Sequence, residues 1–175
     1  MRTEHATQTK KRRAAKRSSQ DAIALLRKDH ENVLEMFERF EKLAEDGDAD
    51  DGEKADLVAR VCNELKVHTR LEEELFYPAV RQAIDEELLM DEALVEHDNA
   101  KRAIEQLEGM QPGDERYDAM VCVLAEEIRH HVKEEHGEIF PKAKKAKMDL
   151  AALGEEMTAR KQALVQEIGD GAMSG

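Results

Sequence analysis

The sequence predicts an all-α fold, an up-down-up-down four-helix bundle with an additional C-terminal helix and a disordered basic N-terminal tail. Strong helix formers dominate the 175 residues, which include only nine Gly, three Pro and no Trp. Apolar residues recur at alternating spacings of three and four in four segments, as on the core-facing side of a helix. No apolar run approaches the roughly 18 residues that span a bilayer, so we expect a soluble protein.

The first two predicted helices are joined by an acidic loop. The first stripe runs from Ile23 to Ala44, after a helix-start signal at Ser18 and Asp21, and stops at loop 47–52. The second stripe runs through Val58, Val61, Leu65, His68, Glu72, Leu75 and Ala79. We therefore expect the first helix to end near residue 45 and the second to begin near residue 53.

Two further stripes predict the other half of the bundle. The third, residues 90–107, ends before Gly109, and Pro112 with Gly113 predicts the following turn. The fourth, residues 121–135, continues to Ile139 one position off its stripe. A weaker stripe at residues 150–168 predicts a fifth, accessory helix outside the bundle or a contact with a partner.

Charge divides the chain unevenly. Residues 1–20 hold seven Lys or Arg and one Glu, a net charge of +6. Because the whole chain has a net charge of −13, residues 21–175 carry −13 − 6 = −19. An acidic body argues against nucleic acid as the main partner. The basic tail is either solvated or a contact for nucleic acid or an anionic membrane. We thus expect a tail at 1–20, the bundle at 21–145 and an accessory helix and tail at 146–175.

The two halves of the bundle repeat each other. A shift of 67 residues aligns the first segment with the third, and a shift of 63 aligns the second with the fourth. The aligned pairs are Asp29 and Glu96, His30 and His97, His68 and His131, Glu72 and Glu135, Glu73 and His136, and Pro78 and Pro141. Each half therefore supplies one His from its first helix and a His-x-x-x-Glu pair from its second.

Six of these polar residues fall on the apolar stripes: His30, His68, Glu72, His97, His131 and Glu135. Residues four apart share one helix face, so each His-x-x-x-Glu pair points in one direction. His30 and His68 lie equally far from their connecting loop, about 22 Å at roughly 1.5 Å per residue, and are therefore level. Burying such groups costs several kcal/mol each without a partner, which favours a metal over mutual His–Glu pairing.

The number and type of donors indicate two metal ions rather than one. Four imidazoles and two carboxylates exceed one tetrahedral zinc site and lack the oxygen shell of calcium or magnesium. Iron or manganese suits the set, and we expect iron. His30 and His68 would hold one ion, His97 and His131 the other, with Glu72 and Glu135 spanning both.

Other His and Cys residues offer competing interpretations. His130 and Glu134 are also four apart, but His131 keeps the ten-residue spacing to Pro141 that His68 keeps to Pro78. His136 and His5 are expected either to be solvated or to lie directly behind the metal ligands, without binding the metal themselves. Cys62 and Cys122 lack a CxxC pattern and are expected to be structural in a cytoplasmic protein, since no signal sequence is evident.

The His-x-x-x-Glu pattern, followed by Phe76-Tyr77-Pro78 and again by Ile139-Phe140-Pro141, resembles the hemerythrin-like family, especially its bacterial His-His-Glu cation-binding members. The resemblance covers about residues 21–143. It implies a di-iron centre, bridged by an oxygen species and two carboxylates, that meets dioxygen, nitric oxide or peroxide.

Two departures separate the chain from the oxygen-carrying hemerythrins. Those proteins carry a further His where this chain has Lys101, and a His-x-x-x-x-Asp pattern where it has His131-x-x-x-Glu135. Reversible oxygen carriage is therefore not implied, and an ammonium at Lys101 would leave one iron with an open position. The resemblance is closer to the hemerythrin-like domain of F-box iron-sensing proteins and to stand-alone bacterial members.

Three function classes remain open at this point. The site could bind or sense dioxygen, nitric oxide or iron, it could act as an enzyme on peroxide or dioxygen, or it could serve iron handling and iron-centre repair. The same ligands serve all three classes, so the sequence does not choose among them or fix the oligomeric state.

Overall fold

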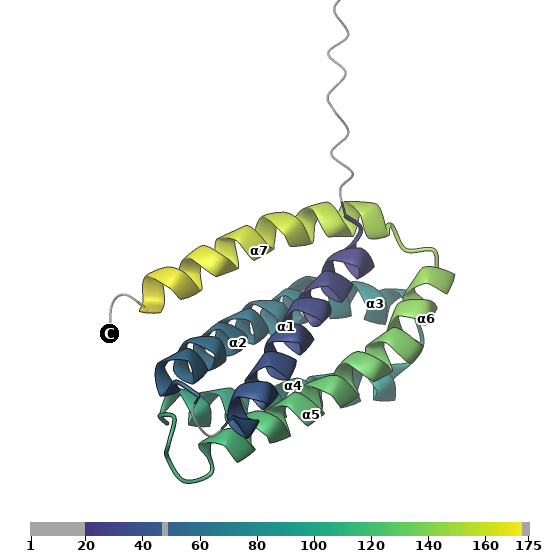
Figure 1. Ribbon diagram of the computed structural model, residues 1–175. Helices are drawn as coiled ribbons and strands as arrows, with labels where there is room; N and C mark the ends of the chain where they lie inside the picture. Colours follow the sequence, from purple (N-terminus) through teal and green to yellow (C-terminus); the bar gives the residue numbers. More distant parts are fainter. Residues whose placement is uncertain (1–19, 47–48, 173–175) are drawn as a thin grey trace, which may run out of the picture.

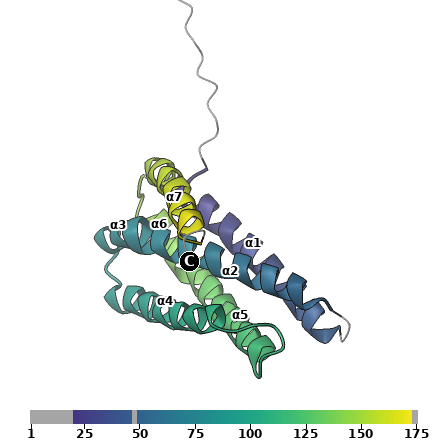
Figure 2. The ribbon, with the colours of Figure 1, turned by 90° about the vertical axis from the view of Figure 1, so that its left-hand side faces the viewer.

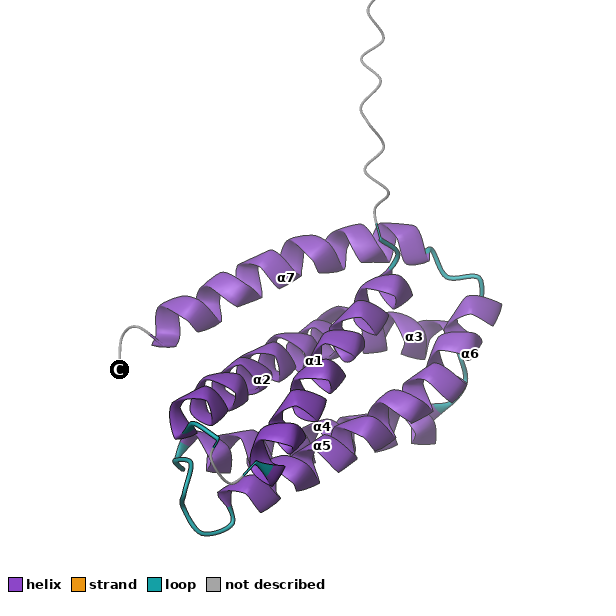
Figure 3. Ribbon diagram, in the orientation of Figure 1, coloured by secondary structure: helices purple, strands orange, loops and turns teal. Residues whose placement is uncertain are grey.

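The structure, a computed structural model, describes residues 20–46 and 49–172. All regular secondary structure in these two stretches is helical (Figure 3). The elements are α1 (Ala22–Glu45), α2 (Asp51–Leu71), the π-helical turn η1 (Glu72–Phe76), α3 (Tyr77–Ala83), α4 (Glu87–Glu108), α5 (Tyr117–Glu134), the π-helical turn η2 (Glu135–Ile139), α6 (Phe140–Lys145) and α7 (Leu150–Ala172).

Helices α1, α2, α4 and α5 form the bundle, and α7 lies across its outside (Figures 1 and 2). Helix α1 packs against α2 and α5, while α4 packs against α5 and α2. The predicted four-helix bundle with an added C-terminal helix is thus confirmed. The predicted basic tail lies outside the described residues, apart from Gln20. Among the described residues, no helix is both long and apolar enough to cross a membrane.

Aspartates begin both helices of the first half. The Asp21 carboxylate accepts a hydrogen bond from the Ala24 N–H at 2.8 Å, and Asp50 accepts one from the Gly52 N–H at 2.7 Å. These side chains satisfy amide groups that have no partner within the helix. Asp21, the second residue of the predicted start signal, is therefore the cap, while Ser18 lies outside the described residues.

Two apolar clusters fill the bundle, one toward each end. The first cluster includes Val33, Leu65, Ile128 and Val132. The second includes Leu26, Phe76, Tyr77 and Phe140 from the bundle, together with Met157 and Leu164 from α7. The buried His and Glu residues belong to neither cluster. They form a polar layer in an otherwise apolar interior.

The π-helical turns correct the predicted second stripe. Leu75 and Ala79 are only partly buried, whereas Phe76, Tyr77 and Val80 are buried. The Tyr77 N–H bonds to the carbonyl of Glu72, five residues back, and this extra residue in the turn moves the apolar face by one position. Turn η2 explains in the same way why Ile139 lies one position off its stripe.

Helix α7 is fixed to the bundle by both apolar and charged contacts. Met157 and Leu164 are fully buried. Arg160 donates to Glu74, and Lys161 donates to Asp29 on α1. The two basic residues that interrupt the predicted apolar face are therefore anchors. Helix α7 packs on α1 and α2, on the outside of the bundle, as predicted for the C-terminal helix.

Gly154 lies close to the backbone at the start of α1, and this predicts a test of the packing. A Cβ at Gly154 would lie 2.4 Å from the Gln20 carbonyl oxygen and 2.7 Å from the Ala22 nitrogen. Gly154→Ala should therefore lower the free energy of unfolding by about 1–3 kcal/mol, as measured by urea denaturation.

Gly169 in the same helix provides the control. A Cβ there would meet nothing within 4 Å, so Gly169→Ala should leave stability unchanged or raise it by up to about 1 kcal/mol. Equal effects of the two substitutions would show that α7 does not pack closely on α1.

Candidate metal centre

The six residues singled out by the sequence pattern meet in one buried layer. Glu72 and Glu135 have no exposed surface, and the four His residues are 2–4% exposed. Their side-chain atoms form two groups close enough to surround a metal ion. The groups are His30, His68, Glu72 and Glu135, and Glu72, His97 and His131. Glu72 belongs to both groups.

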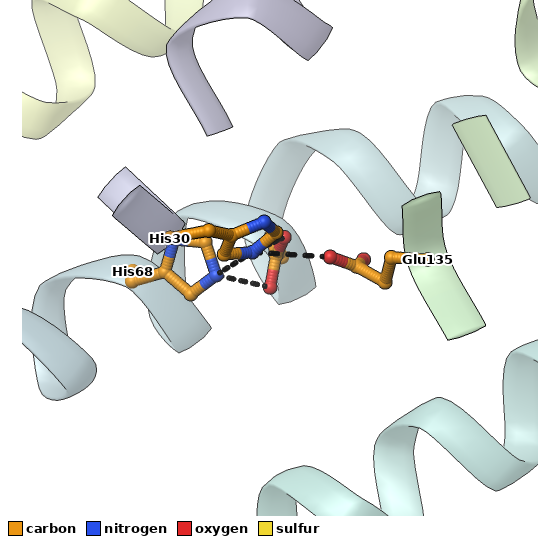
Figure 4. A group of neighbouring side chains, drawn as sticks. His30, His68 and Glu135 are labelled. Atoms are coloured by element: carbon orange, nitrogen blue, oxygen red, sulfur yellow. Dashed lines mark hydrogen bonds and ion pairs between the residues drawn. The ribbon is translucent and has the colours of Figure 1, made fainter. Parts of the chain in front are cut away.

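In the first group, two imidazoles and two carboxylates face a common point (Figure 4). The Nε2 atoms of His30 and His68 lie 2.9 Å apart. His30 Nε2 lies 3.2 Å from Glu135 Oε2, and His68 Nε2 lies 3.2 Å from Glu72 Oε2. Figure 4 shows Glu135 pointing at His30 from a separate helical segment. The two halves of the chain therefore build this group together.

The second group repeats the arrangement with the His residues of α4 and α5. The Nε2 atoms of His97 and His131 are 3.2 Å apart, and His97 Nε2 lies 3.2 Å from Glu72 Oε2. Glu135 Oε2 is 3.8 Å from His131 Nε2. Because each carboxylate approaches His residues of both groups, Glu72 and Glu135 are placed where bridging ligands would be needed.

The unmet hydrogen-bonding capacity of the layer fits a cation. Both oxygens of Glu72 and one oxygen of Glu135 are buried without a hydrogen-bond donor. The His68 Nε2–Glu72 Oε2 separation of 3.2 Å is short enough for a bond, but the two groups do not have hydrogen-bond geometry. Buried carboxylate oxygens without donors are costly, and a metal ion placed among these atoms would remove that cost.

The outer ring nitrogens orient three of the four imidazoles. His97 Nδ1 lies 2.9 Å from Glu73 Oε1, and His131 Nδ1 lies 2.7 Å from Glu96 Oε2. In the neutral form of such a ring, a proton on Nδ1 that is donated to a carboxylate leaves the lone pair on Nε2, facing the layer. His30 Nδ1 instead lies 2.9 Å from His136 Nε2. His136 is thus neither a ligand nor free, but an outer partner of His30.

Tyr77 belongs to the site although sequence reasoning did not include it. Its hydroxyl donates to Glu135 Oε1 at 3.0 Å and lies 3.2 Å from His97 Nε2 and 3.4 Å from His131 Nε2. The π-helical turn, which buries Tyr77 beside Phe76, brings the hydroxyl to this position. The sequence predicted an open coordination position at the second iron, beside His97 and His131. The Tyr77 hydroxyl lies next to that position.

Protons on the imidazoles balance part of the buried charge. Burial opposes a charged His68, but Glu72 with Asp29 and Glu135 outweighs it and raises the pKa of His68 to about 10. Burial likewise opposes a charged His97, while Glu72 and Glu73 raise its pKa to about 9. The same neighbours hold the pKa of Glu72 well below its ordinary value despite its burial. The imidazoles of His68 and His97 are therefore cationic at neutral pH when no metal is bound.

The competing residues lie outside the buried layer. His130 is 63% exposed, with its Nε2 3.4 Å from Glu96 Oε1 and 3.3 Å from Glu134 Oε1 on the surface. Lys101 Nζ is 2.8 Å from Glu73 Oε2 and does not enter the layer.

Cys62 and Cys122 are free thiols, and burial raises the pKa of the Cys62 thiol to about 11, which suppresses its reactive thiolate form.

A small cavity adjoins the four imidazoles. Its volume is about 10 Å³, close to that needed for one water molecule. Its other wall is mostly apolar, formed by Val33, Leu65, Ile128 and Val132 with Asp29 and Thr69 at the side. A molecule in this cavity would contact the imidazoles in a nearly water-free setting.

Comparisons with known proteins agree with this geometry. The family model described as the hemerythrin HHE cation binding domain matches residues 21–143. A crystal structure of a hemerythrin HHE cation binding domain-containing protein from Mycobacterium kansasii, the Rv2633c homolog, is similar with a TM-score of 0.69 and 24% identity, covering 84% of this chain and 88% of that chain. At that identity the likeness establishes the fold alone. A search of curated proteins found no match.

The raised pKa values predict how metal-free protein responds to pH. A His whose pKa is higher in the folded state than its ordinary 6.5 stabilises the fold fully below 6.5, and this contribution is lost as pH rises through about 9 and 10. The melting temperature in excess chelator should therefore fall as pH rises from about 6.5 to about 9. His130→Gln should keep this dependence and His68→Gln should weaken it. A melting temperature that rises over this range would contradict the assigned charges.

Proposed function

Because the chain belongs to the hemerythrin HHE cation-binding family, we propose that its buried layer is a di-iron centre that binds a small molecule such as dioxygen, nitric oxide or peroxide. The observation that carries this proposal is the convergence of four imidazole Nε2 atoms on two fully buried carboxylates, of whose four oxygens only Glu135 Oε1 has a hydrogen-bond donor. That combination is costly without cations and suits two of them.

The two groups of donors would hold the two ions. His30 and His68 would bind at the first position, and His97 and His131 at the second. Glu72 belongs to both groups, and Glu135 of the first group, with Oε2 3.8 Å from His131 Nε2, would be shared as well. Mixed imidazole and carboxylate donors suit iron or manganese, and they leave too few oxygens for calcium. Iron would supply redox chemistry and coordination positions for an exogenous ligand.

The residues around the layer would control access and protons. The apolar wall formed by Val33, Leu65, Ile128 and Val132 excludes bulk water and leaves room only for a molecule of a few atoms. Burial, together with Glu135 and Glu72, raises the pKa of Tyr77 well above its ordinary value, so its hydroxyl keeps a proton. That proton is held against Glu135 Oε1.

The Tyr77 proton also favours a second candidate, an enzyme that acts on peroxide or dioxygen. A binding module needs no acid beside its ligand, whereas reduction of an O–O bond consumes protons. Consumption of peroxide by wild-type protein that Tyr77→Phe loses, with iron content unchanged, would favour the enzyme. Reversible ligand uptake without turnover would favour binding or sensing.

The central test compares two adjacent histidines. His131→Ala should lower the iron bound per chain from about two to about one, because His131 Nε2 faces the layer. His130→Ala, the matched control on the exposed side, should keep about two. Metal analysis after anaerobic loading gives the numbers. Full loading of His131→Ala, or loss of iron from His130→Ala, would contradict the assigned ligands.

The cavity predicts a test of ligand access. Val132→Ile adds a methylene to the cavity wall and should weaken azide binding to the oxidised iron-loaded protein by about tenfold, since the cavity has little spare volume. Perturbation of the visible absorption bands by azide measures this. Val123→Ile, at a position 57% exposed, is the control and should bind azide as wild type does. Equal azide binding by both variants would show that ligands reach the centre by another route.

A further inference from the structure

We propose that the two cation positions are not equivalent, and that the His97–His131 position binds its cation more tightly because His136 and Arg27 replace a carboxylate beside His30. This inference rests on the proposed function, since it concerns the same centre. It names His136 and Arg27 as the positioning residues that set the order of loading.

The internal repeat shows that the two metal positions differ in the residue behind one imidazole. Glu73 and His136 correspond under the shift of 63 residues, and each directly follows a buried glutamate in its π-helical turn. Glu73 meets Nδ1 of His97 at 2.9 Å, and His136 meets Nδ1 of His30 at 2.9 Å. The backbone therefore presents both residues in the same way, but one is an anion and the other an imidazole.

On the second side, both imidazoles donate to carboxylates. Glu73 accepts from His97 and Glu96 accepts from His131, at 2.9 Å and 2.7 Å. A carboxylate partner fixes the proton on Nδ1, so that Nε2 is the atom that gives up a proton to a cation, and it increases the basicity of the ring. Once a cation displaces the Nε2 proton, the ring keeps its Nδ1 proton and its orientation.

On the first side, neither imidazole has such a partner. The carboxylate of Asp29 is the counterpart of Glu96, but its Oδ2 lies 3.8 Å from His68 Nδ1, which is beyond hydrogen-bond range. Asp29 Oδ1 instead accepts from Lys161 of α7. The Nδ1 atom of His30 faces only the ring of His136.

Arg27 further opposes ligation by His30. Its guanidinium can only donate, and Nη1 lies 3.1 Å from His136 Nδ1, so that nitrogen must accept. A neutral His136 then carries its proton on Nε2, directed at His30 Nδ1. His30 Nδ1 therefore faces an N–H where His97 Nδ1 faces a carboxylate. A His30 that binds a cation through Nε2 carries its proton on Nδ1, so loading this side requires His136 to change tautomer and Arg27 to give up its contact.

The number of donors does not separate the two positions. The first group contains four candidate ligands, and Glu135, whose Oε2 lies 3.8 Å from His131 Nε2, brings the second group of three to the same number when it is shared. The outer partners are therefore the main difference. Such partners change metal affinity by about 10- to 100-fold, and we expect the two affinities to differ by a factor in that range.

The experiment is a titration of chelator-stripped, full-length protein with Co²⁺, followed by visible absorption and calorimetry. Wild-type protein should show two binding steps about 10- to 100-fold apart. His97→Ala should remove the tight step and His30→Ala the weak one. A wild type with two equal steps, or loss of the tight step in His30→Ala, would overturn the inference while leaving a two-cation centre intact. No binding at all would overturn the proposed function itself.

Two variants at half-buried positions test the cause. Arg27→Met removes the donor that faces His136, and His136→Glu gives His30 the carboxylate that His97 already has, so both should tighten the weak step and bring the two affinities closer together. Lys28→Met, at an exposed neighbour of Arg27 whose Nζ is 3.4 Å from Glu31, is the matched control and should leave both steps unchanged. An unchanged ratio of the two affinities in both Arg27→Met and His136→Glu would overturn the assigned role of these residues.

Discussion

The fully buried carboxylates of Glu72 and Glu135 are the constraint on which the rest of the structure depends. Each carries a charge that the apolar interior cannot stabilise, so cationic partners must surround it. The bundle supplies four imidazoles at the same level, and the raised pKa values of His68 and His97 show that protons balance the charge in the metal-free state. Cations that replace those protons would release them, which couples metal binding to pH.

The helix geometry follows from the need to bring so many donors to one level. Each buried glutamate begins a π-helical turn, and the added residue turns the apolar face so that Phe76 and Tyr77 follow Glu72 into the interior. A second π-helical turn begins at Glu135 and moves the apolar face in the same way. Helix α7 then covers this end of the bundle and, through Lys161, holds Asp29 beside His68. The accessory helix is thus connected to the candidate metal centre.

Sequence reasoning predicted the fold and which residues meet, because both depend on regular helical spacing. The repeat distinguished His131 from His130, and the structure places only His131 in the layer. The π-helical turns were not predicted, although Ile139 off its stripe was a signal of the second one. Tyr77 was missed, and the sequence did not decide whether His136 is solvated or lies behind a ligand, because both depend on approaches between helices, which no spacing along one helix reveals.

Anomalous diffraction at the iron edge, from crystals of the iron-loaded full-length chain, tests the central claim most directly. The account predicts two peaks per chain in the buried layer, about 3.5–4 Å apart, one beside His30 and His68 and one beside His97 and His131. A single peak in the layer, or iron held only by the surface group of Glu96, His130 and Glu134, would contradict it.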